Sequence, residues 1–150
     1  MSHLELIPAE VSLKMVRGDT FLRKLFQASE FVDPADSEKG FIPININEIE
    51  FLFEIRVDRF ESDCSSPLLS VGMEYLFYGQ SEHALQYDID QGNPGGTTWD
   101  ELHAEIPPEL TKIDPGRWWH GIRATYPTGV VELLWQHRVR VIADVPRKSK

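Results

Sequence analysis

Cysteine is almost absent from this chain. Cys64 is the only cysteine among 150 residues, so no disulfide can form within the chain. This usage fits folding in a reducing compartment. Cys64 stands in a polar stretch, residues 61–66, with no histidine close in the sequence, and a catalytic thiol is therefore not expected there.

Long apolar runs are also missing. No segment approaches the roughly 20 apolar residues that a membrane-spanning helix needs. The N-terminus lacks the basic region and apolar stretch of a signal peptide. The sequence therefore predicts a soluble protein with no signal peptide and no membrane partner.

Positive charge is in deficit. Lysine and arginine together number 15 against 24 aspartates and glutamates, which gives a net charge of -9 and a pI near 5.0. Phosphate contacts need concentrated lysine and arginine, whereas here the basic residues are scattered, apart from the tail at residues 147–150. We expect no nucleic-acid partner and interpret the tail as a solubilising end.

The length suits one domain and is too short for two ordinary ones. At 41% hydrophobic and 26% charged residues, the composition is that of a folded globular chain. We predict a single β-sandwich domain over residues 1–146 and a short basic tail over 147–150.

Helical periodicity is scarce, whereas alternation of apolar and polar residues recurs between turn residues, which is typical of an all-β chain. The clearest strand is residues 49–58, where five apolar side chains alternate with polar ones and predict a central strand. Further strands are expected at 3–8, 11–16, 20–27, 68–71, 73–78, 84–89, 99–106, 118–126, 130–135 and 138–145. The last three would form a C-terminal β-meander, with Gln136 and His137 as a two-residue link. The pattern predicts an antiparallel sandwich.

Two long loops are expected at residues 28–48 and 90–98. The first contains Pro34, Gly40 and Pro43, and a short edge strand is expected inside it at residues 42–46. The second is rich in glycine. Strands 73–78 and 84–89 would form a hairpin, and residues 109–113 a single helical turn.

Motifs that carry chemistry are absent. No histidine pair has metal-ligand spacing on one helix, and neither a nucleophile elbow nor a phosphate loop is present. Residues 88–93 resemble part of a calcium loop but lack the closing glutamate. Neighbouring strands would bring His103 and His120 together, which leaves a small hydrolase or metal-dependent enzyme as a third hypothesis. We expect no enzyme, and no catalytic, cofactor or metal site.

Aromatic side chains are the candidate interaction residues. Trp118 and Trp119 are adjacent in an expected strand, so one indole falls on each face. Tyr75, Tyr78 and Trp99 lie close to expected loops. Where such residues are exposed, they form either a protein-interaction surface or a platform on which carbohydrates stack. Packing in the core is the commoner use of tryptophan and tyrosine.

Several segments, taken in order, resemble one family. They are the run Leu13 to Thr20 with its Arg-Gly-Asp-Thr turn, Ile55-Arg56, residues 66–69, Ile113 to Trp118 with its Pro-Gly-Arg-Trp element, Gly121 to Thr125, and Arg138 to Val145. This order is similar to that of phage- and prophage-encoded immunoglobulin-like β-sandwich proteins related to the N-terminal domain of phage baseplate upper proteins. The match covers most of the chain. It departs from the family at Gly121, where an aspartate is common, and in the stretch 71–98.

The resemblance implies a structural or assembly protein of a phage or prophage particle, namely a tail, baseplate or head–tail accessory component. It implies protein–protein contacts with other virion proteins or with copies of itself, as a homo-oligomer. The chain would occupy the host cytoplasm during assembly and the virion afterwards. The alternative from the residues is a carbohydrate or cell-surface binding module that uses exposed tryptophan and tyrosine.

Overall fold

Two sheets make up the fold of the computed structural model, which describes residues 5–8, 13–31, 41–61, 65–93, 96 and 98–143. The first, called here the β3 sheet, has the order β1 (Glu5–Pro8), β3 (Phe21–Phe31), β8 (Glu101–Ile106) and β7 (Leu76–Gly79), with β4 (Phe41–Pro43) also paired to β3. The second, called the β9 sheet, has the order β2 (Leu13–Val16), β10 (Val131–Ile142), β9 (Gly116–Thr125), β5 (Glu50–Arg56) and β6 (Leu69–Val71).

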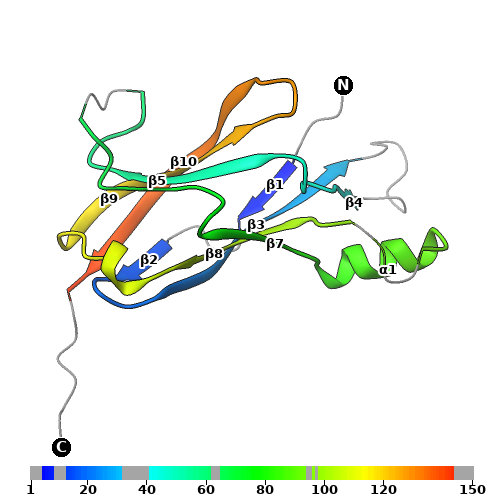
Figure 1. Ribbon diagram of the computed structural model, residues 1–150, viewed down its shortest axis with the longest axis horizontal. Helices are drawn as coiled ribbons and strands as arrows, with labels where there is room; N and C mark the ends of the chain where they lie inside the picture. Colours follow the sequence, from blue (N-terminus) through cyan, green and yellow to red (C-terminus); the bar gives the residue numbers. More distant parts are fainter. Residues whose placement is uncertain are drawn as a thin grey trace, which may run out of the picture.

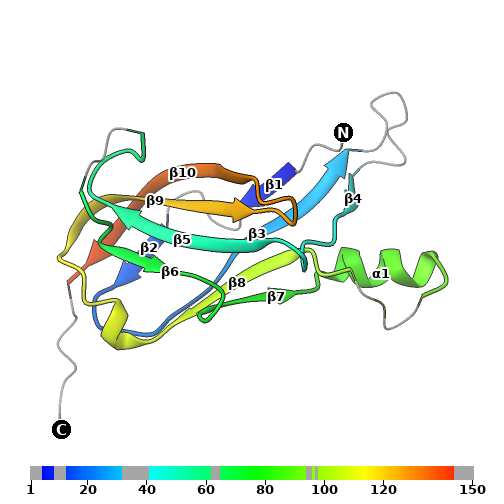
Figure 2. The ribbon, with the colours of Figure 1, turned by 45° about the horizontal axis from the view of Figure 1, so that its top comes forward.

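The sheets lie face to face, as Figures 1 and 2 show, and their inner side chains form one core. The strand pairings are antiparallel except that of β2 with β10, which is parallel. The predicted all-β sandwich is confirmed. No helix in the described ranges is long and apolar enough to cross a membrane.

Strand β5 is an inner strand of its sheet, as the alternation predicts. Phe51, Phe53 and Ile55 are at most 2% exposed, and the strand is paired with β9 on one side and β6 on the other. Val57 lies beyond the end of the strand and is exposed.

A register shift in β3 places two consecutive side chains in the core. Phe21 and Leu25 are buried as expected, and the irregularity between Lys24 and Phe26 turns Phe26 inward as well. The Phe26 ring meets the rings of Phe51 and Trp135 edge-on, at 5.3 Å in each case. Phe26 therefore joins the two sheets.

The strand expected at residues 84–89 is wrong, because the chain forms helix α1 (Glu82–Asp90) there. Ser81 caps the helix by accepting a hydrogen bond from the Ala84 amide. The buried carboxylate of Asp100 accepts from both the amide and the hydroxyl of Ser81, and so ties the start of α1 to the β8 segment. Both ribbon views show α1 projecting beyond the sheets.

The other end of α1 is also held by a buried carboxylate. Asp88 is 4% exposed and accepts hydrogen bonds from the hydroxyl and amide of Thr98. This closes the loop expected at 90–98, whose described residues carry neither helix nor strand except Asp90, the last residue of α1. Residues 88–93 resemble part of a calcium loop, but the carboxylate of Asp88 in this stretch holds the loop in place through Thr98.

Two strand boundaries differ from expectation. Residues 28–31 continue β3, and the last three of them pair with β4, so the first long loop begins later than predicted. Residues 32–40 lie outside the described part. Strand β10 runs unbroken through Gln136 and His137, so the expected link there is wrong. A register shift between Leu133 and Trp135 resets the alternation, which explains why the sequence pattern indicates a break.

The helical turn expected at residues 109–113 is the short helix η1 (Pro108–Leu110). Cys64 and the tail lie outside the described residues.

Candidate binding site

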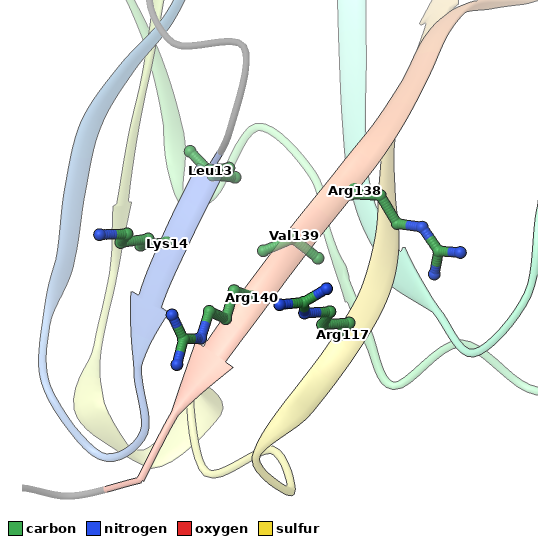
Figure 3. A pocket seen from close by; sticks show the side chains of 6 residues that line it. All are labelled: Leu13, Lys14, Arg117, Arg138, Val139 and Arg140. Carbon is green, nitrogen blue, oxygen red and sulfur yellow. The ribbon is translucent and has the colours of Figure 1, made fainter.

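A groove with a volume of about 460 Å³ lies where β2, β10 and β9 run side by side. Its lining combines two apolar and four basic residues: Leu13, Val139, Lys14, Arg117, Arg138 and Arg140. Figure 3 shows these side chains on the three strands. We call this feature the basic groove.

Strand alternation explains why the cations face outward. Val139 and Val141 are 1% and 2% exposed and point into the core, so Arg138 and Arg140 point away from it. Strand pairing sets Arg140 opposite Lys14 of β2 on one side and Arg117 of β9 on the other. Three cations thus form a row across three strands.

The four basic side chains of the groove are not paired with any acidic side chain in the described part of the chain. Within the described ranges no carboxylate forms an ion pair with Lys14, Arg117, Arg138 or Arg140. Like charges at directly opposite positions destabilise a sheet. A row of unneutralised cations in a protein of net charge -9 is therefore suited to receive an anion.

Trp119 extends the groove along the same face. It stands opposite Arg138 in the strand register, and the Arg138 guanidinium lies 4.4 Å from the centre of its ring. Arg59 contacts the same ring at 5.3 Å. These cation–π contacts order both arginines, and Arg59 is also paired with the Glu61 carboxylate at 2.6 Å.

Beyond Trp119, the outer face of the β9 sheet is covered by the segment 57–61. Phe60 is 7% exposed and lies between the guanidinium groups of Arg56 and Arg123, at 5.3 and 5.5 Å. Both arginines bond to the buried carboxylate of Glu54. Here one carboxylate offsets part of the positive charge of the two arginines, in contrast to the basic groove.

The five aromatic residues predicted as an interaction surface do not gather in one place. Trp118, Tyr75 and Tyr78 are partly buried and pack against the core. Trp119 faces outward next to the basic groove, on the other side of β9 from Trp118. Trp99 is 36% exposed and its amide donates to Asn45. Of the five, Trp119 is the residue that adjoins the groove.

The expectation that neighbouring strands bring His103 and His120 together is wrong, because they belong to different sheets. His103 lies on the outer side of β8, where its Nε2 atom is 2.9 Å from the Glu101 carboxylate and its ring stacks on Phe77. His120 points into the core against Phe53. The two therefore share no site.

His120 is an apolar-core histidine. It is 4% exposed, and among the residues that the structure describes neither ring nitrogen has a hydrogen-bond partner. Burial, with a further contribution from the nearby His137, lowers the pKa of His120 to about 4. The described residues contain no group of three side chains that is suited to hold a metal ion.

The basic groove was not predicted from the sequence, although one signal was present. Arg138 and Arg140 alternate with Val139 and Val141, which indicates two cations on the solvent face of the last strand. The contributions of Lys14 and Arg117 depend on strand order, which the sequence does not display.

No family model and no curated protein matches the chain. Among solved structures, it is similar to CopC from Methylosinus trichosporium OB3b, with 14% identity, coverage of 97% of this chain and 100% of that one, and a TM-score of 0.42. It is also similar to murine CRIg, with 8% identity, coverage of 97% and 99%, and a TM-score of 0.30. Neither likeness bears on what this chain binds.

Proposed function

We propose that this domain is a structural or assembly protein of a phage or prophage particle that acts through protein–protein contacts on the outer face of the β9 sheet. The observation that carries the proposal is the basic groove, whose four cations have no acidic partner in the described residues. The particle context comes from the sequence resemblance described above.

A docking role fits the construction of this face. The groove cations are carried by paired strands, so their backbones are fixed before a partner arrives, and little ordering of the chain is needed on binding. Trp119 and the Arg138 that stacks on it are residue types enriched in protein interfaces. Charge on such a face steers an acidic partner and fixes its orientation.

The carbohydrate-binding alternative has less support. A stacking platform needs aromatic rings exposed together, whereas three of the five candidates pack against the core. The ring of Trp119 is already contacted by Arg59 and Arg138. A glycan array with hits that depend on Trp119 or Trp99 would favour this alternative over the assembly role.

Particle fractionation tests the proposal. Phage or prophage particles from a strain that encodes the chain are purified on a density gradient and probed with an antibody raised against the domain. The proposal expects the chain to co-sediment with tail-containing particles, and expects the Arg138→Glu/Arg140→Glu variant to be lost from them. A wild-type chain that stays entirely in the soluble fraction contradicts the proposal.

A further inference from the structure

The centre of the basic groove is the pair Arg140 and Arg117. In Figure 3 their side chains lie next to β10, while Lys14 and Arg138 extend away from it on opposite sides. Neighbouring strands lie about 4.8 Å apart, so the Lys14, Arg140 and Arg117 backbones span roughly 10 Å across the sheet. This width suits two or three anionic groups rather than a long charged polymer.

The residue types narrow the chemistry of the ligand. Arginine presents a planar fork of donors that matches a carboxylate or a phosphate through two parallel hydrogen bonds. Leu13 and Val139 also border the groove, but their side chains are only 4% and 1% exposed, so a ligand meets mainly the four cations. Glutamate and aspartate side chains carry the carboxylate that such a fork of donors pairs with.

Charge outside the groove argues against a nucleic-acid ligand. The net charge of -9 repels an extended polyanion. The described cations next to the groove do not continue it as a track of unpaired charge, because Arg59 is paired with Glu61 and the arginines at 56 and 123 share the carboxylate of Glu54. A short peptide with a few carboxylates avoids most of that repulsion.

We propose that the basic groove binds a short acidic peptide segment of a partner protein, with Arg140 and Arg117 pairing with its carboxylates and Lys14 and Arg138 flanking them. This inference rests on the docking role proposed above and names the partner's chemistry. The complementary charge of the ligand would relieve the repulsion within the row.

Fluorescence anisotropy with labelled peptides of roughly eight residues tests the inference at about 50 mM and about 200 mM salt. The probes are a peptide of alternating glutamate and serine, the same peptide with glutamine in place of glutamate, and an oligothymidylate of similar length. We expect the glutamate peptide to bind, the glutamine peptide to bind at least tenfold more weakly, and added salt to weaken the binding. Equal affinity for the two peptides would overturn the inference, and so would tighter binding of the oligothymidylate.

Charge-reversed variants locate the binding. Arg140→Glu and Arg117→Glu are each expected to weaken the glutamate peptide roughly tenfold or more. Lys112→Glu makes the same charge change at an exposed lysine that does not line the groove and is expected to change affinity less than about twofold. An equal loss in all three variants would show a general charge effect and overturn the groove as the site. Circular dichroism melting of each variant verifies that it is folded.

Light scattering separates a foreign partner from a second copy. Self-association that Arg140→Glu abolishes would identify the occupant as another copy of this chain and overturn the partner assignment. A chain that enters particles but ignores the glutamate peptide refutes the acidic segment and leaves the proposed function standing. A chain that binds the peptide but is absent from particles refutes the proposed function and leaves the acidic peptide as the ligand of the groove.

Discussion

The ring of Phe60 lies directly over Gly121, and a Cβ atom at position 121 would stand 2.7 Å from the Phe60 Cζ atom. The Phe60 amide also donates to the side-chain oxygen of Gln136 at 2.8 Å. The absence of a side chain at 121 therefore lets the segment 57–61 settle onto the sheet. This gives a physical reason for a glycine at position 121.

Gly121→Ala is expected to displace Phe60 and to lower the free energy of unfolding by about 1–3 kcal/mol, the usual cost of overpacking. Urea denaturation measures the change. In a Phe60→Ala background the same substitution meets no ring, so its cost should shrink. Equal costs in the two backgrounds would mean that the Phe60 contact is not the cause.

Glu54→Gln is expected to lower the free energy of unfolding by about 1–3 kcal/mol, because it removes the charge that holds two arginines. The Glu54 side chain is 5% exposed and accepts from the Arg56 Nη2 atom at 3.1 Å and the Arg123 Nε atom at 2.9 Å. Glu105→Gln, an exposed carboxylate on β8, serves as the matched control and should leave the denaturation midpoint unchanged. Comparable losses in the two variants would argue against a specific role for Glu54.

Acidification is expected to destabilise the fold through His120. The unfolded side chain takes up a proton near its ordinary pKa of 6.5, whereas the buried ring resists protonation until the pKa of about 4. Stability therefore falls as the pH drops from about 6.5 to about 4, and this one group accounts for about 3 kcal/mol of the loss.

Denaturation midpoints measured across that pH range for His120→Phe test this account. The variant should lose this part of the pH dependence, while His83→Gln, at an exposed histidine of α1, should keep it. An unchanged pH profile in His120→Phe would assign the dependence to other groups.

Asp100→Ala is expected to loosen α1 while the two sheets stay folded. The carboxylate bonds to both the amide and the hydroxyl of Ser81, and its loss leaves the first turn of the helix without its anchor. Hydrogen exchange should accelerate in Glu82–Asp90 more than in Glu50–Arg56. Uniform acceleration throughout the chain would indicate general destabilisation instead.

Local alternation predicted the strands well where one face meets the core and the other meets solvent. Strand β5 is the clearest case, since Phe51, Phe53 and Ile55 all face inward as the pattern requires. Helix α1 was missed because it projects from the sheets, leaving Leu85 and Ile89 42% and 53% exposed, so its apolar residues do not mark a buried face. The capping serine at its start was the available signal.

The candidate site was harder to predict because it depends on strand order. Arg138 and Arg140 lie on one strand and alternate visibly, but Lys14 is more than a hundred positions away in the sequence. It joins them through the parallel pairing of β2 with β10. Parallel pairing of distant segments has no local signature in the sequence. The net negative charge of the whole chain also gives no indication of a cationic face.

Carbodiimide crosslinking of intact particles tests the central claim most directly, because this reagent joins a lysine amine to a carboxylate in contact with it. Lys14 lines the basic groove, whereas Lys112 is exposed and does not line it. If the domain docks an acidic partner through the groove, mass spectrometry should find Lys14 joined to an aspartate or glutamate of another particle protein. Crosslinks at Lys112 with none at Lys14 would contradict the claim.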